Sequence, residues 1–190
     1  KLLGAFLNNS VITRLRTAQR QFGLDRAISI ITLQETRFCG IMQADIRNFT
    51  KMFGSGSEIE VAKLVRQCFS EISSVGQDLA VIKPVGDCIF VYCDDETGRE
   101  NAVLNIIALA IFFVNSVGRI NRTLQARGAP TLNFGIALHA GDAVYGNLAS
   151  ETLIDPTIIG LNVNMTARLE ELTKVPEIQH LTGENAIIFS

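Results

Sequence analysis

The sequence of 190 residues contains no tryptophan, two histidines and four cysteines. Cys39, Cys68, Cys88 and Cys93 form no Cys-x-x-Cys pair. Because a structural zinc site needs closely spaced Cys and His ligands, this spacing disfavours zinc. It favours reduced, buried thiols, which are typical of a cytoplasmic protein.

The sequence also lacks an excess of one charge and a hydrophobic run that could span a bilayer. Seventeen Lys and Arg against 19 Asp and Glu give a net charge of -2, which disfavours a nucleic acid polymer as partner. The longest apolar run, Ala102 to Val114, is interrupted by Asn105 and is shorter than the roughly 20 residues of a membrane span. We therefore expect a buried helix there, and any membrane contact only through regions outside this sequence.

Hydrophobic residues make up 47% of the chain and charged residues 19%, so it is not disordered and is long enough to bury a core. Residues 1–34 combine helical apolar spacing with arginines, and Asp25 could cap a second short helix. They predict an N-terminal helical linker or dimerisation segment. Residues 35–190 form the predicted main domain. The sequence starts at Lys1 rather than Met, which suggests a piece of a larger protein.

The main domain alternates predicted strands and helices. Helices separated by hairpins favour an α+β fold, in which a mixed sheet is covered by helices over one face. A capping box of Ser57 and Glu60 marks the start of the first of these helices. The expected elements are a buried strand at 39–46, a helix at 57–76, a hairpin of 79–82 and 88–93, a helix at 100–126, a strand pair of 132–138 and 143–148, a strand at 157–159, a helix at 164–173 and a last strand at 186–189.

Two carboxylates stand where predicted strands end. Asp45 follows a buried strand, and Asp87 lies at the tip of the first hairpin after Gly86. A carboxylate at the edge of an apolar strand is costly unless it faces water, a partner or a metal. Two on neighbouring strand ends could share a pair of divalent cations, as in phosphoryl transfer. The alternative is that Asp45 caps the following turn and Asp87 serves the hairpin, and spacing alone leaves both open.

Several stretches of the main domain carry distinctive polar and glycine-containing motifs: ADIRNFT at 44–50, KPVGD at 83–87, GIALHAG at 135–141 with VYGN at 144–147, and IGLNVNMTARLE at 159–170. Together they resemble, in order and spacing from about Phe38 to Ser190, the catalytic domain of the class III nucleotide cyclases. In that family the first two correspond to the metal motifs, the next pair to the central hairpin and the last to the catalytic Asn/Arg helix. The resemblance implies a ferredoxin-like cyclase core, with the final C-terminal hairpin missing from this sequence.

The resemblance implies a role for each residue of the metal motifs. Asp45 and Asp87 would hold two Mg²⁺ or Mn²⁺ ions, with the Ile46 carbonyl as a further ligand, which suits hard cations. The backbone amides of Phe49 and Thr50 would cradle phosphate oxygens.

It also implies how the nucleotide is bound. Asn164 would orient the ribose, and the Arg168 guanidinium would stabilise charge that develops at the α-phosphate. Lys83 occupies the position where adenylate-forming members carry Lys. Thr157 occupies its partner position, where the bicarbonate-responsive subclass has Thr or Ser, and its alternative is an ordinary strand residue. The pair resembles the adenylyl type of that subclass, with bicarbonate as a possible activator.

In this family the metal carboxylates come from one protomer, and the Lys, Thr, Asn and Arg come from the other. Because all of them occur in this chain, the resemblance implies a head-to-tail homodimer with two shared sites. The expected activity is that of an adenylate cyclase, which converts ATP to 3′,5′-cyclic AMP and pyrophosphate.

The sequence departs from the family in several places. Asn133 and Gly135 stand where many members carry a phosphate-binding Arg, and Asn48 replaces a usual Gly. Asn tolerates the left-handed backbone conformation better than most residues. The missing Arg and the end at Ser190 favour an alternative: a catalytically silent regulatory module that binds nucleotide or bicarbonate, or only dimerises.

Overall fold

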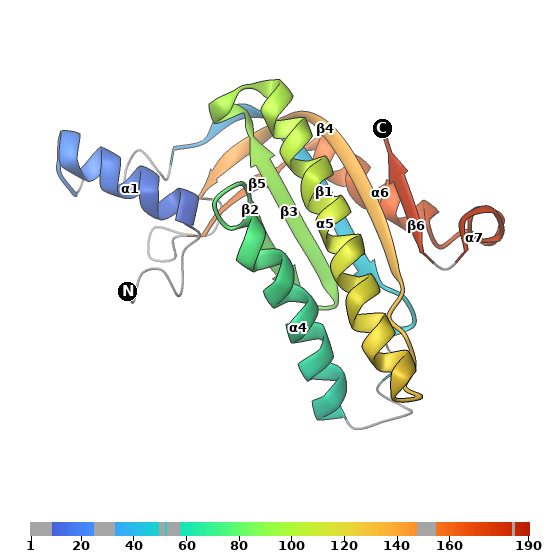
Figure 1. The fold of residues 1–190 in the computed structure, drawn as a ribbon. Coiled ribbons are helices and arrows are strands. Elements are labelled where there is room, and N and C mark those ends of the chain that lie inside the picture. Colours follow the sequence, from blue (N-terminus) through green and yellow to red (C-terminus); the bar gives the residue numbers. More distant parts are fainter. Residues whose placement is uncertain (1–8, 25–32, 50–51, 53–57, 148–154, 184) are drawn as a thin grey trace.

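The structure is a computed structural model in which six strands form one sheet (Figure 1). It describes residues 9–24, 33–49, 52, 58–147, 155–183 and 185–190. The described elements are α1 (Asn9–Phe22), β1 (Glu35–Ile46), α4 (Glu58–Gly76), β2 (Val81–Val85), β3 (Cys88–Asp94), the 3-10 turn Asp95–Thr97, α5 (Arg99–Ala126), β4 (Phe134–Asn147), β5 (Pro156–Ile159), α6 (Leu161–Leu172), α7 (Pro176–Thr182) and β6 (Ala186–Phe189).

The sheet is mixed, as predicted, and it is curled. Its strand order is β2-β3-β1-β4-β5, with antiparallel neighbours, and β6 pairs with β4 in parallel. Two contacts join the opposite ends of this order. The Tyr92 hydroxyl donates to the Pro156 carbonyl at 3.1 Å, and Lys83 Nζ lies 2.6 Å from Asp155 Oδ1. The curl therefore brings β2 and β3 back toward β5 over one face.

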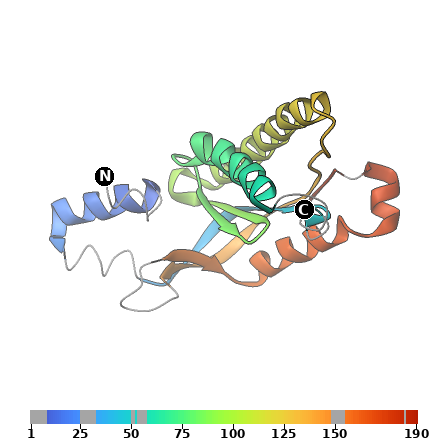
Figure 2. The same cartoon turned by 90° about the horizontal axis from the view of Figure 1, so that it is seen from below.

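Alternation along β1 divides the interior between two faces. Met42, Ala44 and Ile46 belong to the main core beneath α4 and α5, whereas Cys39 and Ile41 belong to a smaller cluster on the other face. Successive strand side chains point to opposite faces, so Asp45 lies on the same face as Ile41. The expectation of helices over one face is wrong in this respect, because α6 covers part of the second face (Figure 2).

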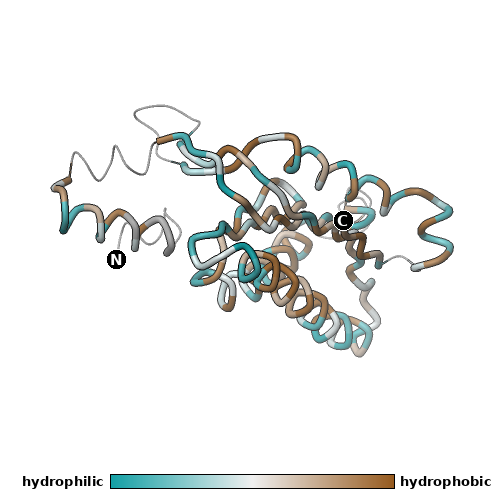
Figure 3. Tube along the Cα trace, turned by 90° about the horizontal axis from the view of Figure 1, so that it is seen from above, coloured by the Kyte–Doolittle hydropathy of each residue, from teal (hydrophilic) through white to brown (hydrophobic). Residues whose placement is uncertain are grey.

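The apolar run after Ala102 lies in α5, a helix predicted to within one residue at its start. Its inner face, with Ile106, Leu109 and Phe113, is buried in the main core. Hydrophobic residues nevertheless continue around it (Figure 3), and its outer face exposes a stripe of Leu104, Ile107, Ile111 and Val114. By length and composition alone α5 could cross a membrane, but core helices of globular domains pass the same test. The prediction of a buried helix therefore holds for its inner face.

The central hairpin expected around His139 is wrong. β4 is one continuous strand, because β1 pairs with it from Glu35 opposite Tyr145 to Ile46 opposite Phe134. Gly141, in the stretch between the two expected strands, has a different role. A Cβ at Gly141 would collide with the Asn162 side chain, whose Oδ1 accepts from His139 Nε2 at 3.0 Å. The start of α6 thus lies directly against β4.

Other boundaries differ less. The helix expected at 164–173 begins earlier, at Leu161, and α7 was not predicted. The strands at 157–159 and 186–189 are confirmed as parts of β5 and as β6. Residue Ser57 of the capping box and the second helix near Asp25 lie outside the described residues. The division into segments 1–34 and 35–190 stays a prediction.

All four cysteines are free, and burial raises the pKa of each thiol to about 12 from an ordinary 9.0. Cys39, Cys68 and Cys93 are buried, as predicted, whereas Cys88 is only partly buried. We expect the free energy of unfolding to fall as the pH rises from about 9 toward about 12. In that range the unfolded chain releases thiol protons that the folded chain retains, so it binds fewer protons.

Denaturant unfolding at several pH values between about 7 and 11 checks this expectation. Cys68→Ala removes one titrating thiol from the core and should make the fall shallower. An equally steep fall in that variant would assign the pH dependence to other groups.

Candidate functional site

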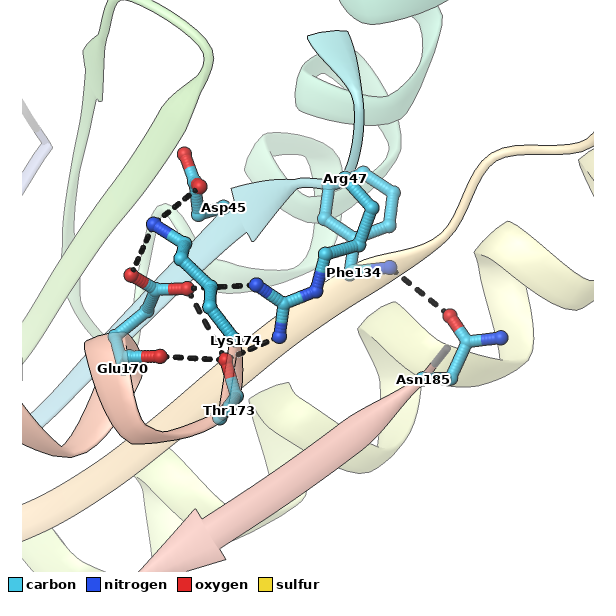
Figure 4. Close-up of polar contacts among 7 residues, drawn as sticks. All are labelled: Asp45, Arg47, Phe134, Glu170, Thr173, Lys174 and Asn185. Atoms are coloured by element: carbon cyan, nitrogen blue, oxygen red, sulfur yellow. Dashed lines mark hydrogen bonds and ion pairs between the residues drawn. The ribbon is translucent and has the colours of Figure 1, made fainter. Parts of the chain in front are cut away.

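Asp45 is the next-to-last residue of β1 and lies on the face that α6 shares. Its carboxylate Oδ2 is 2.9 Å from Lys174 Nζ, and its side chain is 18% exposed. The same ammonium lies 2.8 Å from Glu170 Oε2, so Lys174 bridges a carboxylate of β1 and one of α6 (Figure 4). Burial alone would lower the pKa of Lys174, but hydrogen bonds to Glu170 and Asp45 outweigh it and raise that pKa. Lys174 therefore stays charged at neutral pH.

Arg47 completes this cluster from the turn after β1. Its guanidinium is 6% exposed, lies 3.4 Å from Glu170 Oε1 and donates to Thr173 Oγ1. Its Nε has no hydrogen-bond partner among the described residues. The guanidinium lies so close to Gly135 that a Cβ there would collide with it. Gly135, one of the two positions considered for a phosphate-binding Arg, thus lies directly against the Arg47 guanidinium.

Ile46 and Asp87 lie next to this cluster. The backbone N–H of Ile46 donates to the Asp87 carbonyl at 3.4 Å, which brings the β2–β3 turn against the end of β1. Within the described part of the chain, the Asp87 carboxylate makes no hydrogen bond or ion pair. A cavity of about 280 Å³ opens here, lined by Asp45, Ile46, Arg47, Asn48, Lys174 and Gln179.

These groups fit a hard divalent cation. Asp45 already holds one cationic group, the Lys174 ammonium, and two carboxylates with a carbonyl are the oxygen ligands that Mg²⁺ and Mn²⁺ prefer. No group of three or more His, Cys, Asp or Glu side chains is assembled for a metal among the described residues. A cation here would take its remaining ligands from water and phosphate, as Mg²⁺ commonly does.

The backbone of the turn after β1 agrees with the expectation that Asn48 can adopt the left-handed conformation. Its φ is 56°, and it is the one non-glycine residue with positive φ in the described ranges. Phe49 follows it in a helical turn, in which the N–H of Met52 donates to the Asn48 carbonyl at 3.2 Å. Phe49 packs against the main core, so its side chain anchors the turn that is expected to cradle phosphate. Thr50 lies outside the described residues.

Lys83 lies on β2 opposite Phe90, on the same face of the sheet as Asp45. Its ammonium pairs with Asp155 at 2.6 Å, and the backbone N–H of Asp155 donates to the Asn147 side chain. Thr157, the expected partner, lies two residues farther on in β5, opposite Gly146. Sequence reasoning missed Asp155, whose acidic side chain just before a predicted strand was the available signal.

Asn164 and Arg168 lie four residues apart on α6, and both are exposed. The Arg168 side chain makes no hydrogen bond or ion pair with any described residue. Glu170 is buried toward Arg47, and two residues of helix correspond to about 200° of rotation. Arg168 therefore points away from the carboxylate cluster of its own chain. The structure gathers Asp45, Ile46 and Asp87 at one place and holds Asn164 and Arg168 apart from them.

Comparison with known proteins matches residues 31–186 to the family of the adenylate and guanylate cyclase catalytic domain. The chain belongs to this family. An adenylate cyclase of Anabaena cylindrica is 30% identical over 145 residues, which cover 73% of this chain and 28% of that protein. Adenylate cyclase 1 of Rhizobium meliloti is 25% identical and is covered over 20% of its length. The chain thus spans under a third of these curated relatives.

Solved cyclase structures share the fold. The adenylyl cyclase CyaB from P. aeruginosa gives a TM-score of 0.68 at 24% identity, over 74% of each chain. The guanylyl cyclase Cya2 gives 0.66 at 26% identity, over 73% of this chain and 71% of that one. Class III cyclase domains generally use divalent metal ions, bind a nucleotide and dimerise. The predicted family and its α+β core are confirmed, whereas the neighbours include both nucleotide specificities.

Proposed function

We propose that this cyclase domain is an adenylyl cyclase that converts ATP to 3′,5′-cyclic AMP and pyrophosphate. The observation that carries the proposal is the position of Asp45, at the end of β1 beside the Asp87 turn, with a cation on its carboxylate. The choice of ATP rests on Lys83. Its ammonium donates hydrogen bonds, which suits the acceptor N1 of adenine and not the N–H of guanine.

In the proposed reaction the ribose 3′-oxygen attacks the α-phosphorus. A bond forms between them, the bond to the bridging oxygen of the β-phosphate breaks, and the hydroxyl proton passes to water. Asp45, Asp87 and the Ile46 carbonyl would hold Mg²⁺ or Mn²⁺, which would supply positive charge against the triphosphate. The chain itself binds phosphate through the backbone amides of Phe49 and Thr50.

The remaining roles belong to a second protomer in the proposed head-to-tail homodimer. Asn164 orients the ribose, and Arg168 stabilises charge on the transferring phosphoryl group. Lys83 and Thr157 contact the base, and Asp155 holds the Lys83 ammonium in place. The outward direction of Arg168 supports this arrangement, because it leaves Arg168 available to a neighbouring chain.

Two further proposals follow from the sequence. Thr157 in the base pocket points to the bicarbonate-responsive subclass, in which bicarbonate raises the rate. A cytoplasmic location suits both ATP as substrate and four free thiols.

A cyclic-nucleotide assay with Mn²⁺ tests the proposed function, with ATP and GTP supplied separately. We expect cyclic AMP from ATP, at least about tenfold more than cyclic GMP from GTP, because the wrong base leaves the Lys83 donor unpaired. Cyclic GMP as the main product would contradict the role of Lys83. The same assay with added bicarbonate tests the subclass, and an unchanged rate would argue against it.

The silent regulatory module is a second candidate, favoured by a specific observation. Lys174 is paired with Asp45, and Arg47 is tied to Glu170 and lies against Gly135, one of the two positions considered for a phosphate-binding Arg. Nucleotide binding without product from ATP or GTP would support this candidate over the enzyme.

A further inference from the structure

Lys174 lies against one of the two Asp45 carboxylate oxygens that a metal ion could bind. Its ammonium is 2.9 Å from Asp45 Oδ2 and 2.8 Å from Glu170 Oε2, and it borders the cavity beside Ile46. Figure 4 shows the Lys174 side chain reaching between the two carboxylates. A divalent ion bound to Asp45 Oδ2 would lie about 2.0–2.2 Å from that oxygen. The metal ion and the Lys174 ammonium would then repel each other at short range.

The ion pairs of Lys174 with Asp45 and Glu170 neutralise two largely buried carboxylates, but a metal ion can still replace the lysine. The side chains of Asp45 and Glu170 are 18% and 8% exposed, so both carboxylates depend on a protein cation in the absence of metal. Lys174 itself is 47% exposed and follows the end of α6, so its flexible stem can swing outward. Glu170 has a second partner in Arg47 and remains paired when Lys174 moves.

We propose that Lys174 is a tethered counter-ion of Asp45, which a divalent metal must displace before it can bind. The inference rests on the proposed function, because it takes Asp45 as a metal ligand. It adds a regulatory property of this chain: the apparent metal affinity is lowered by a competing charge that the protein carries itself. Removing that charge therefore tightens metal binding even when no nucleotide is present.

Titration of the whole 190-residue chain with Mn²⁺, without nucleotide, measures this competition through the electron paramagnetic resonance signal of free Mn²⁺. Lys174→Gln should bind Mn²⁺ about tenfold more tightly than the unmodified chain, the size expected for one close charge near the surface. Lys63→Gln is the matched control. Lys63 is exposed on α4, on the opposite face of the sheet, and its loss should change the affinity less than about twofold.

Asp45→Asn distinguishes the claim that Asp45 binds the metal from the claim that Lys174 competes with it. If it abolishes Mn²⁺ binding while Lys174→Gln binds no more tightly than Lys63→Gln, the metal ligand stands and the competition is refuted. If Asp45→Asn binds Mn²⁺ like the unmodified chain, both the metal assignment and the competition fail.

A second measurement uses the unmodified chain and so does not depend on the folding of a variant. Lysines labelled with [¹³C]methyl groups are followed by nuclear magnetic resonance during titration with Mg²⁺. We expect the Lys174 signal to move as Mg²⁺ binds. A Lys174 signal that stays fixed while Mg²⁺ binds the unmodified chain would overturn the proposal.

Discussion

Mixing Asp45→Ala protein with Arg168→Ala protein is expected to restore cyclase activity that neither variant shows alone. Each variant alone should lose about 10²- to 10³-fold in rate, because every site then lacks a carboxylate or the guanidinium. In a mixture of equal parts, half of the dimers pair one of each and keep one intact site of two, so about a quarter of the unmodified activity returns. The rate of cyclic AMP formation measures it.

The expected recovery of activity follows from the direction of the Arg168 side chain. It points away from Glu170 on α6, and Glu170 faces the carboxylate cluster around Asp45. Asp45→Ala mixed with Asp87→Ala is the control, because both changes fall in the same half of a site and no heterodimer has an intact one. Inactivity of the Asp45→Ala and Arg168→Ala mixture, with both proteins folded and dimeric, would contradict the shared site.

Replacing Arg47 by Met should cost about 3 kcal/mol of stability, because it breaks a buried ion pair from one side. Glu170 Oε1 loses its cationic partner and Thr173 Oγ1 loses its donor, and neither can reach water easily, since both residues are buried. Lys174 still pairs with Glu170, which places the cost at the lower end of the usual range. For a chain of this size we expect the midpoint of thermal unfolding to fall by about 6–12 °C. Circular dichroism measures that midpoint.

Arg119→Met is the matched control for Arg47→Met. Arg119 lies 2.7 Å from Glu71, but the two side chains are 50% and 32% exposed. Exposed pairs of this kind contribute less than about 1 kcal/mol. Equal midpoints for the two variants would show that the Arg47 cluster does not hold β1 against α6.

The fold was largely predictable because the hydrophobic spacing that specifies most of its helices and strands is local in the sequence. Periodicity located α4, α5 and most strands, and the positive φ of Asn48 agrees with its place where the family usually has Gly. The sequence failed where a long-range partner decides. Gly141 reads as a turn residue, yet β1 extends the strand through it, and the glycine makes room for Asn162.

The site was predictable in part for the same reason. Asp45 and Asp87 stand out because a carboxylate at the end of an apolar strand is costly unless it faces water, a partner or a metal. The pairings of Lys174 with Asp45 and of Asp155 with Lys83 could not be predicted, because the partners are distant in sequence and meet only through the curl of the sheet and the position of α6. Glu170 resembles an ordinary surface residue of a helix until Arg47 is known to lie beneath it.

The central position of β1 has a consequence for how the chain folds during synthesis. β1 can pair with β3 as soon as residue Asp94 has emerged, but its other edge stays open until β4 follows, from Phe134 onward. An unpaired edge of a buried strand is a site for misdirected pairing between chains. Versions of this domain that end before β4 should therefore aggregate rather than fold, and slow translation between α5 and β4 should prolong the time during which β1 is at risk.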